Sequence, residues 1–275
     1  MRLTAVTDEI SMDFAHALDV LKEYGCVGAE IRSLWDANIA DLPDERIDEA
    51  RRILDLKQLE VCCVSAPLYK CELGSRDGRT ERTADQQLDL LRHMARLAGL
   101  FGTNRVRVFS FWRHGELTAE IEDRIAEGMA DSVKFAEDNG IELVLENEHA
   151  CYLGTGCEAA RFLDRINSPA LGAVWDPGNA FFAGEKPFPD GYEAIRRHVR
   201  HVHVKDAVAL ASGEKKFVVV GDGEIDYAGQ FAALKADGYE GWLSLETHYA
   251  PFAGTLEQGS RLCFQALRKL LGDLE

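Results

Sequence analysis

The chain has 275 residues, a length that a single α/β barrel domain often takes. Its 47 Asp and Glu residues outnumber its 31 Lys and Arg residues, and the net charge of −16 would repel the phosphate backbone of a nucleic acid. The first residues, MRLTAVTDEI, show no basic segment followed by a long apolar run, and no stretch reaches the roughly eighteen apolar residues of a membrane span. We therefore expect a cytoplasmic protein that binds neither nucleic acid nor a membrane.

Short runs rich in β-branched and apolar residues alternate with longer amphipathic stretches along the whole chain. In the first amphipathic stretch, Phe14, Leu18 and Leu21 recur at helical spacing, and Gly25 stands where such a helix would stop. Stretches that end in the same way precede the fifth and eighth runs, in SVKFAEDNG and FAALKADGYEG. The eight runs predict strands at 3–7, 28–33, 60–66, 105–111, 141–147, 171–176, 200–205 and 242–247.

Eight strand–helix units predict the α/β class and, within it, a (β/α)8 TIM barrel that takes residues 1–275 as a single domain. An open doubly wound sheet is the alternative if one or two strands are miscounted. The longest irregular segment, 206–225, follows the seventh predicted strand and contains a predicted small hairpin across ASGEKKFVVV. In a barrel this segment would overhang the C-terminal mouth, where active sites are built.

Seven cysteines are scattered along the chain without a CxxC pair or zinc-finger spacing. Their number is odd, which does not suit a framework of disulfides. We expect reduced thiols that mostly serve as small core residues.

The last four predicted strands each deliver one potential metal ligand at the C-terminal mouth, where residues distant in sequence become neighbours. These residues are Glu146, Asp176, His203 and Glu246. Three carboxylates and one imidazole suit a divalent cation such as Mn²⁺, Mg²⁺, Co²⁺ or Zn²⁺. Without a cation the three carboxylates would repel one another, whereas a metal lets them stay ionised.

The strand-end motifs LVLEN, VWDPGN, HVHVKD and LSLET, together with TDEIS, AEIR and SAPLYK, resemble the sugar isomerase and epimerase superfamily of xylose-isomerase-like TIM barrels. The resemblance covers essentially the whole chain. It implies a divalent metal held by Glu146, Asp176, His203 and Glu246, and two glutamates that exchange protons with carbon. A metal that binds a carbonyl and the adjacent hydroxyl would acidify the α C–H bond and stabilise a cis-enediolate.

The motif HVHVKD places His201, His203 and Lys205 on one side of the seventh strand by its period of two. His203 lies nearest the level of the other ligands, so we expect His201 one layer deeper as a supporting residue. Glu30 and Arg32 also share a face by period two, and we expect them to form an ion pair inside the barrel, with contacts to a substrate as the alternative.

Many members of the superfamily have His three residues after the aspartate of the sixth strand, whereas this chain has Asn179. Asn keeps hydrogen-bonding groups but cannot titrate near neutrality. Asn179 is therefore either a substrate contact or simply part of the turn that Pro177-Gly178 predicts. The other candidate substrate-binding residues are Lys205, Asp206, Lys70, His149, Trp112 and Arg113, for each of which ion pairing or loop packing is the alternative.

The sequence therefore predicts a metal-dependent isomerase or epimerase of a small keto-sugar or sugar-like polyol, with Glu146 and Glu246 as acid and base. A lyase of the inosose dehydratase type, which would use the same metal site, is the nearest alternative. A sugar-binding barrel without catalysis is a third, because Asn179 departs from the pattern. The acidic charge and the few spare histidines argue against the DNA-acting endonuclease IV branch. A homo-oligomer stays open, since many barrels of this superfamily self-associate.

Overall fold

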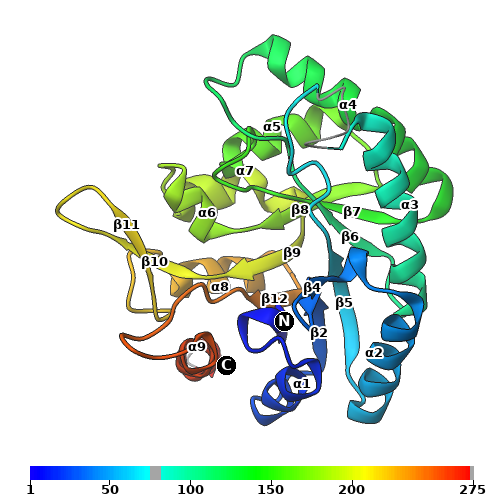
Figure 1. Ribbon diagram of the computed structural model, residues 1–275. Helices are drawn as coiled ribbons and strands as arrows, with labels where there is room; N and C mark the ends of the chain where they lie inside the picture. Colours follow the sequence, from blue (N-terminus) through cyan, green and yellow to red (C-terminus); the bar gives the residue numbers. More distant parts are fainter. Residues whose placement is uncertain (75–81, 273–275) are drawn as a thin grey trace.

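The protein is represented by a computed structural model that describes residues 1–74 and 82–272. Eight parallel strands pair in the order β1-β12-β9-β8-β7-β6-β5-β2, and a backbone bridge between Val6 and Glu30 joins the two ends of this row (Figure 1). The barrel strands are β1 (Arg2–Ala5), β2 (Gly28–Ile31), β5 (Glu60–Ser65), β6 (Arg105–Val108), β7 (Glu142–Glu146), β8 (Leu171–Trp175), β9 (Val199–Val204) and β12 (Trp242–Leu245). The predicted TIM barrel is confirmed.

Helices surround the barrel, and the first shows why they form where they do. Asp13 caps its N-terminus by accepting a hydrogen bond from the backbone of His16, and Phe14, Leu18 and Leu21 are buried on one face, as predicted. The α-helices are α1 (Phe14–Glu23), α2 (Asp44–Lys57), α3 (Ala84–Leu100), α4 (Ala119–Asn139), α5 (Gly156–Ile166), α6 (Pro177–Phe182), α7 (Tyr192–Ile195), α8 (Tyr227–Ala236) and α9 (Leu256–Gly272). Single turns of other helix types lie at Thr7–Glu9, Ile39–Asp41, Pro187–Gly191 and Arg196–His198.

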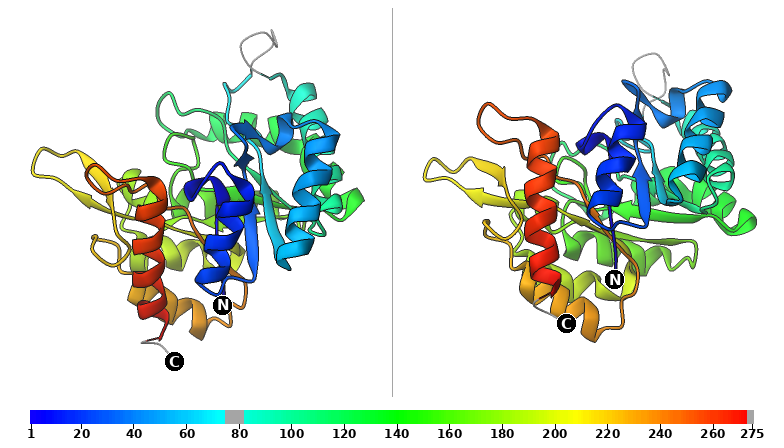
Figure 2. Two further views of the ribbon diagram at one scale, coloured as in Figure 1. Left: turned by 60° about the horizontal axis from the view of Figure 1, so that its bottom comes forward. Right: turned by 90° about the horizontal axis from the view of Figure 1, so that it is seen from below.

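Helices α1 and α9, from opposite ends of the described chain, lie side by side (Figure 2). Tyr24 stacks on Phe264 with ring centroids 4.8 Å apart, and Arg261 pairs with Glu23 across the same contact. This contact covers the outside of the barrel where β1 pairs with β12. The first and last units of the chain are thereby held together.

All eight predicted strands are present, but each one ends one to three residues earlier than the sequence pattern suggests. The segment after β6 shows the reason. Phe109, Ser110 and Phe111 stay buried although the strand ends at Val108. The apolar pattern thus continues into the loops of the mouth, where residues stay buried although they no longer pair with a neighbouring strand.

None of the seven cysteines forms a disulfide, and Cys157 alone among them is exposed, as expected for reduced thiols. Among the residues that the structure describes, no helix is long and apolar enough to cross a membrane.

The barrel interior contains a buried carboxylate, Glu30, that accepts hydrogen bonds from three side chains. Ser65 lies 2.7 Å away, His201 Nε2 2.8 Å and His203 Nε2 3.2 Å. The expected Glu30–Arg32 ion pair is therefore wrong. Strand β2 ends at Ile31, so Arg32 no longer follows the alternation of the strand and lies at the mouth instead.

A hairpin of β10 (Asp206–Ala209) and β11 (Lys215–Val218) projects from the mouth after β9 (Figure 1), and it begins earlier than the predicted hairpin. The Asp206 carboxylate accepts hydrogen bonds from the backbone of Ala207, Gly221 and Gly223 at 2.8 to 3.1 Å. A Cβ at position 223 would lie 2.0 Å from Asp206 Oδ1, so glycine is required there. Asp206 thus organises the segment that carries the hairpin.

Replacing Asp206 with Ala should lower the free energy of unfolding by about 1–3 kcal/mol, because several buried N–H groups would lose their acceptor. Urea denaturation followed by circular dichroism measures this change. The matched control is Asp222→Ala at an exposed position of the same segment, where we expect a change of no more than about 0.5 kcal/mol. Unchanged stability together with weaker substrate binding in Asp206→Ala would instead support the substrate contact that the sequence predicts.

Candidate active site

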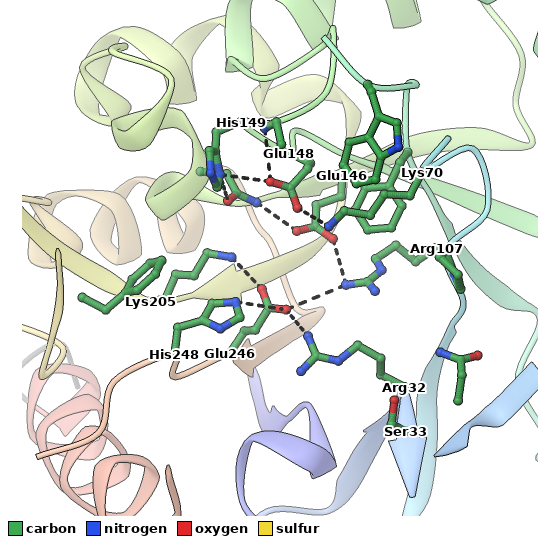
Figure 3. A pocket seen from close by; sticks show the side chains of 17 residues that line it. Arg32, Ser33, Lys70, Arg107, Glu146, Glu148, His149, Lys205, Glu246 and His248 are labelled. Atoms are coloured by element: carbon green, nitrogen blue, oxygen red, sulfur yellow. Dashed lines mark hydrogen bonds and ion pairs between the residues drawn. The ribbon is translucent and has the colours of Figure 1, made fainter. Parts of the chain in front are cut away.

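A pocket of about 530 Å³ opens at the C-terminal mouth of the barrel, within which several charged side chains converge on Glu246 (Figure 3). Its charged and imidazole lining residues are Arg32, Lys70, Arg107, Glu146, Glu148, His149, Lys205, Glu246 and His248. Asp176 and His203 lie beneath the pocket and are fully buried.

The four predicted metal ligands lie together, each offering one ligand atom, with all four atoms within 4.8 Å of one another. From His203 Nδ1, the nearest carboxylate oxygens of Glu246, Asp176 and Glu146 lie 3.4, 3.6 and 3.7 Å away. These distances are long for hydrogen bonds. Atoms that share a cation at about 2.1 Å are separated by roughly 3–4 Å, which matches this spacing.

One buried atom of the cluster, His203 Nδ1, has no hydrogen-bond partner among residues 1–74 and 82–272, whereas Asp176 Oδ2 forms an ion pair with Lys205 Nζ over 2.8 Å. Buried polar atoms are normally satisfied, so an orphaned imidazole nitrogen that faces three carboxylates needs an explanation. A divalent cation would supply it, since an imidazole nitrogen and carboxylate oxygens are suitable ligands. The residues present therefore fit a metal site.

His203 is held from its other side by the buried Glu30. The Glu30 carboxylate lies 3.2 Å from His203 Nε2 and also binds His201, so the Nδ1 atom of His203 is aimed at the cluster. Burial by itself raises the pKa of Glu30, but the two imidazoles outweigh it and hold that pKa well below its usual range. Second-layer carboxylates of this kind orient metal-binding histidines in many sites. His201 is thus one layer deeper, where the sequence predicts it.

Three cations surround the carboxylates of the cluster. Lys205 Nζ lies 2.6 Å from Glu246 and 2.8 Å from Asp176, and Arg107 lies 2.9 Å from Glu146. Arg32 lies 2.6 Å from the second oxygen of Glu246. Burial lowers the pKa of Lys205, but the carboxylates of Asp176 and Glu246 raise it by more. The pKa therefore lies above its usual value, and this lysine stays charged.

The sequence leaves open whether Asn179 is part of a turn or a pocket residue, and in the structure it is both. It lies in the first turn of α6 and also lines the pocket. Asp176 Oδ1 caps the helix by accepting a hydrogen bond from the backbone of Asn179. The side-chain Nδ2 of Asn179 donates to Glu146 over 2.9 Å, and its Oδ1 lies 3.0 Å from His149 Nδ1. The neighbouring Gly178 lets the Lys205 side chain pass close to the start of α6, since a Cβ at position 178 would lie 2.5 Å from that side chain.

The other predicted substrate-binding residues fall into two groups. Lys205, Lys70, His149 and Trp112 line the pocket with Asn179. Arg113 pairs with Glu158 outside the pocket lining, and the Asp206 carboxylate is taken up by backbone groups. The structure brings the first group together and leaves the second apart.

Arg107, Glu148 and Phe217 are among the pocket residues that escaped the sequence analysis. Arg107 could have been found from the alternation in RVRV, which puts Arg105 and Arg107 on one face of β6 and the two valines on the other. Glu148 pairs with Lys70 over 2.6 Å, a contact between two distant loops that leaves no local signal. Phe217 of β11 stacks on Phe182 with centroids 4.7 Å apart, and this aromatic wall depends on how the hairpin folds over the mouth.

His203 and His201 offer a matched test of the metal site, because they lie two residues apart on the same face of β9. His203→Gln should abolish stoichiometric Mn²⁺ or Zn²⁺ binding, since it removes a ligand. His201→Gln keeps an amide donor toward Glu30 and should weaken binding by no more than about 10–100-fold. Calorimetric titration and metal analysis after dialysis measure both variants, with circular dichroism to check the fold. Metal loss in His201→Gln but not in His203→Gln would reverse the assignment.

Comparison with known proteins supports the barrel fold and identifies relatives of the chain. The family described as "Xylose isomerase-like TIM barrel" matches residues 18–270. The inosose dehydratase of Geobacillus thermodenitrificans is 30% identical over 155 residues, which is 49% of each chain. The match thus spans about half the length of this relative. The inosose dehydratase of Yersinia enterocolitica is 24% identical over 270 residues, covering 86% of this chain and 83% of the relative.

Solved structures agree in fold at lower identity. The probable 3-DHS dehydratase AsbF of Bacillus anthracis superimposes with a TM-score of 0.78 at 17% identity, covering 98% of this chain and 99% of that one. The IOLI protein with a bound zinc atom gives 0.78 at 18%, covering 99% of each chain. The D-allulose 3-epimerase of Methylomonas sp. gives 0.76 at 18%, covering 99% and 96%. The chain belongs to the xylose isomerase-like TIM barrel family, and its relatives include enzymes that modify sugars and related polyols.

Proposed function

We propose that the protein is a metal-dependent lyase that removes water from a polyhydroxylated ketone, the class of substrate to which inososes belong. The observation that carries this proposal is the environment of Glu246. One oxygen of Glu246 lies 2.6 Å from Arg32 and the other lies 2.6 Å from Lys205. The curated relatives, which are inosose dehydratases, support the same choice.

The ion pairs of Glu246 separate this proposal from the epimerase that the sequence favours. Epimerisation by two bases needs both glutamates to exchange a proton with carbon, one from each side of the substrate. Glu246 has a cation beside each of its oxygens, and these ion pairs stabilise the ionised carboxylate and make it a weaker base toward carbon. Elimination of water needs only one carboxylate to remove a proton from carbon.

Glu146 is the better placed of the two carboxylates to act as that base. One of its oxygens pairs with Arg107 at 2.9 Å, and the other accepts a hydrogen bond from the neutral amide of Asn179. Glu146 also lines the pocket, so a substrate can reach it. This base would take a proton from the carbon next to the carbonyl group.

Glu146, Asp176, His203 and Glu246 would hold a divalent cation, which supplies Lewis-acid polarisation of the carbonyl and neighbouring hydroxyl oxygens when bound. Arg107 and Lys205 place two further positive charges beside the negative charge that develops on those oxygens. The electron pair left by the removed proton then forms a carbon–carbon double bond as the β C–O bond breaks. The departing hydroxide takes up a proton and leaves as water.

The test is product analysis with the metal-loaded protein. Incubation with inososes and ketohexoses in deuterated water, followed by mass spectrometry, should show loss of one water from at least one polyhydroxylated ketone. Conversion to an epimer that keeps the water, with deuterium at one carbon, would support the epimerase instead. Neither product nor solvent exchange, with metal bound and sugar retained, would support a binding barrel without catalysis.

Replacing Glu146 with Gln should lower the rate of water loss by about 10²–10⁴-fold, because the amide cannot accept the proton from carbon. Because Glu146 is also a proposed ligand, metal content is measured on the same sample and the rate is compared at equal metal occupancy. The control is Glu116→Gln, at an exposed position of the loop after β6, which should behave as wild type. A metal-loaded Glu146→Gln protein with the wild-type rate would contradict the assignment of the base.

A further inference from the structure

His149 lies in the loop after β7 and is a pocket residue whose side chain is 40% exposed. Its Nδ1 atom lies 3.0 Å from Asn179 Oδ1 and 3.0 Å from Glu148 Oε1. The ring also packs beside Phe182, with centroids 5.2 Å apart. Two polar contacts on one nitrogen and an aromatic neighbour hold the imidazole in one orientation, as Figure 3 shows for its polar side.

The contacts of Asn179 decide which nitrogen of His149 carries a proton. Asn179 lies between Glu146 and His149, and a carboxylate can only accept, so the amide nitrogen faces Glu146. The amide oxygen then faces His149 and needs a donor. Glu148, the second partner of the same ring nitrogen, is a carboxylate that also accepts from Lys70 over 2.6 Å. Both partners therefore require a hydrogen on Nδ1.

This arrangement makes Nε2 the nitrogen of His149 that gains and loses a proton. No hydrogen bond or ion pair of Nε2 is found among residues 1–74 and 82–272, so this nitrogen of a pocket residue can bind another molecule. A histidine fixed through Nδ1 by a carboxylate, with Nε2 toward the substrate, is the arrangement that lets an imidazole act as an acid or a base.

The charges around the ring favour its protonated form. The hydrogen bond with Glu148 is the main cause that raises the pKa of His149, and Asn179 adds to it, while partial burial and the charge of Lys205 act in the opposite direction. Lys70 faces the other oxygen of Glu148 and keeps that carboxylate ionised. His149 thus stands as an acid on the side of the pocket where Asn179 connects it to the proposed base, Glu146.

We infer that His149 is a catalytic acid, which donates its Nε2 proton to the hydroxyl group that leaves. The inference rests on the proposed function, because it assigns a residue to the second half of the elimination. Glu146 accepts the proton from carbon, the electron pair forms the double bond, and the β C–O bond breaks. The leaving oxygen takes the proton from Nε2 and departs as water. The exposed ring is then protonated again by solvent, and Glu146 releases its proton.

Two substitutions separate proton transfer from binding and positioning. His149→Gln places an amide N–H near the position of Nε2 and can still bind a hydroxyl group, but it cannot deliver a proton. His149→Asn instead keeps a donor near the position of Nδ1, toward Asn179 and Glu148. Each is measured as the metal-loaded protein, by water loss and by exchange of the carbon-bound proton with deuterated water.

We expect His149→Gln to lose water about 10²–10⁴-fold more slowly than wild type, with little change in KM, while proton exchange at carbon continues. A ketone with fluorine in place of the β-hydroxyl group should lose fluoride at a similar rate in both proteins, since fluoride leaves without a proton. His149→Asn should show the same pattern as His149→Gln. The inference would be overturned if His149→Gln lowered the rates of proton exchange and of water loss equally. It would also be overturned if this variant lost water at the wild-type rate.

The pH profile gives an independent check with a defined sign. The imidazolium form is the active acid, so the wild-type rate of water loss should fall as pH rises through the pKa of His149. With the fluoro substrate, the wild-type rate should not fall in this pH range. The rate of His149→Gln should not fall there with either substrate. A fall that persists in His149→Gln would assign it to another group and contradict the inference.

Failure of the proposed function has a different signature. Wild-type protein that exchanges the carbon-bound proton and epimerises the ketone without losing water would overturn the proposed lyase, and the role of His149 with it. Water loss by wild type that His149→Gln retains in full would overturn only the role of His149. Nitrogen NMR of the labelled protein should in either case show the neutral ring protonated at Nδ1, and an Nε2–H tautomer would remove the structural basis of the inference.

Discussion

The structure depends on burying several carboxylates inside the barrel. Isolated buried charges are costly, and removing one partner of a buried ion pair commonly costs about 3–5 kcal/mol. The barrel meets this constraint by giving each carboxylate partners from other strands. Glu30 is paired with two histidines of β9, Glu146 with Arg107 of β6, and Glu246 with Lys205 and Arg32.

The same pairing shapes the chemistry of the site, because it makes the carboxylates unequal. Asp176 and His203 are fully buried and form the floor, whereas Glu146 and Glu246 line the pocket. Of these two, Glu246 is held by two cations and Glu146 by one cation and a neutral amide. A symmetric pair of glutamates, which the sequence alone suggests, thus becomes one carboxylate held by two cations and one held by a single cation and an amide.

That the four proposed ligands lie together could be predicted from the sequence, because a barrel brings all strand ends to one mouth. Strand period likewise placed His203 nearer the mouth than His201, and the structure agrees. The partners across the barrel could not be predicted in this way. Period two gives the face of a residue but neither the end of its strand nor the direction of a long side chain. Arg32 was therefore assigned to Glu30 although it reaches Glu246.

Loop residues were harder to predict, because their roles depend on backbone paths that have no period. Asp206 follows the end of β9 one residue after Lys205. Its short side chain nevertheless accepts hydrogen bonds from the backbone amides of its own loop. For Asn179 the sequence left two interpretations open, a substrate contact and a turn. The structure shows that it connects Glu146 to His149, a histidine from the neighbouring loop. The imidazole of His149 is therefore connected to Glu146 although position 179 itself is not a histidine. A comparison of position 179 alone would miss it. The amide between the two groups also fixes the ring nitrogen that faces the pocket, which a histidine at position 179 could do only in one of its own protonation states.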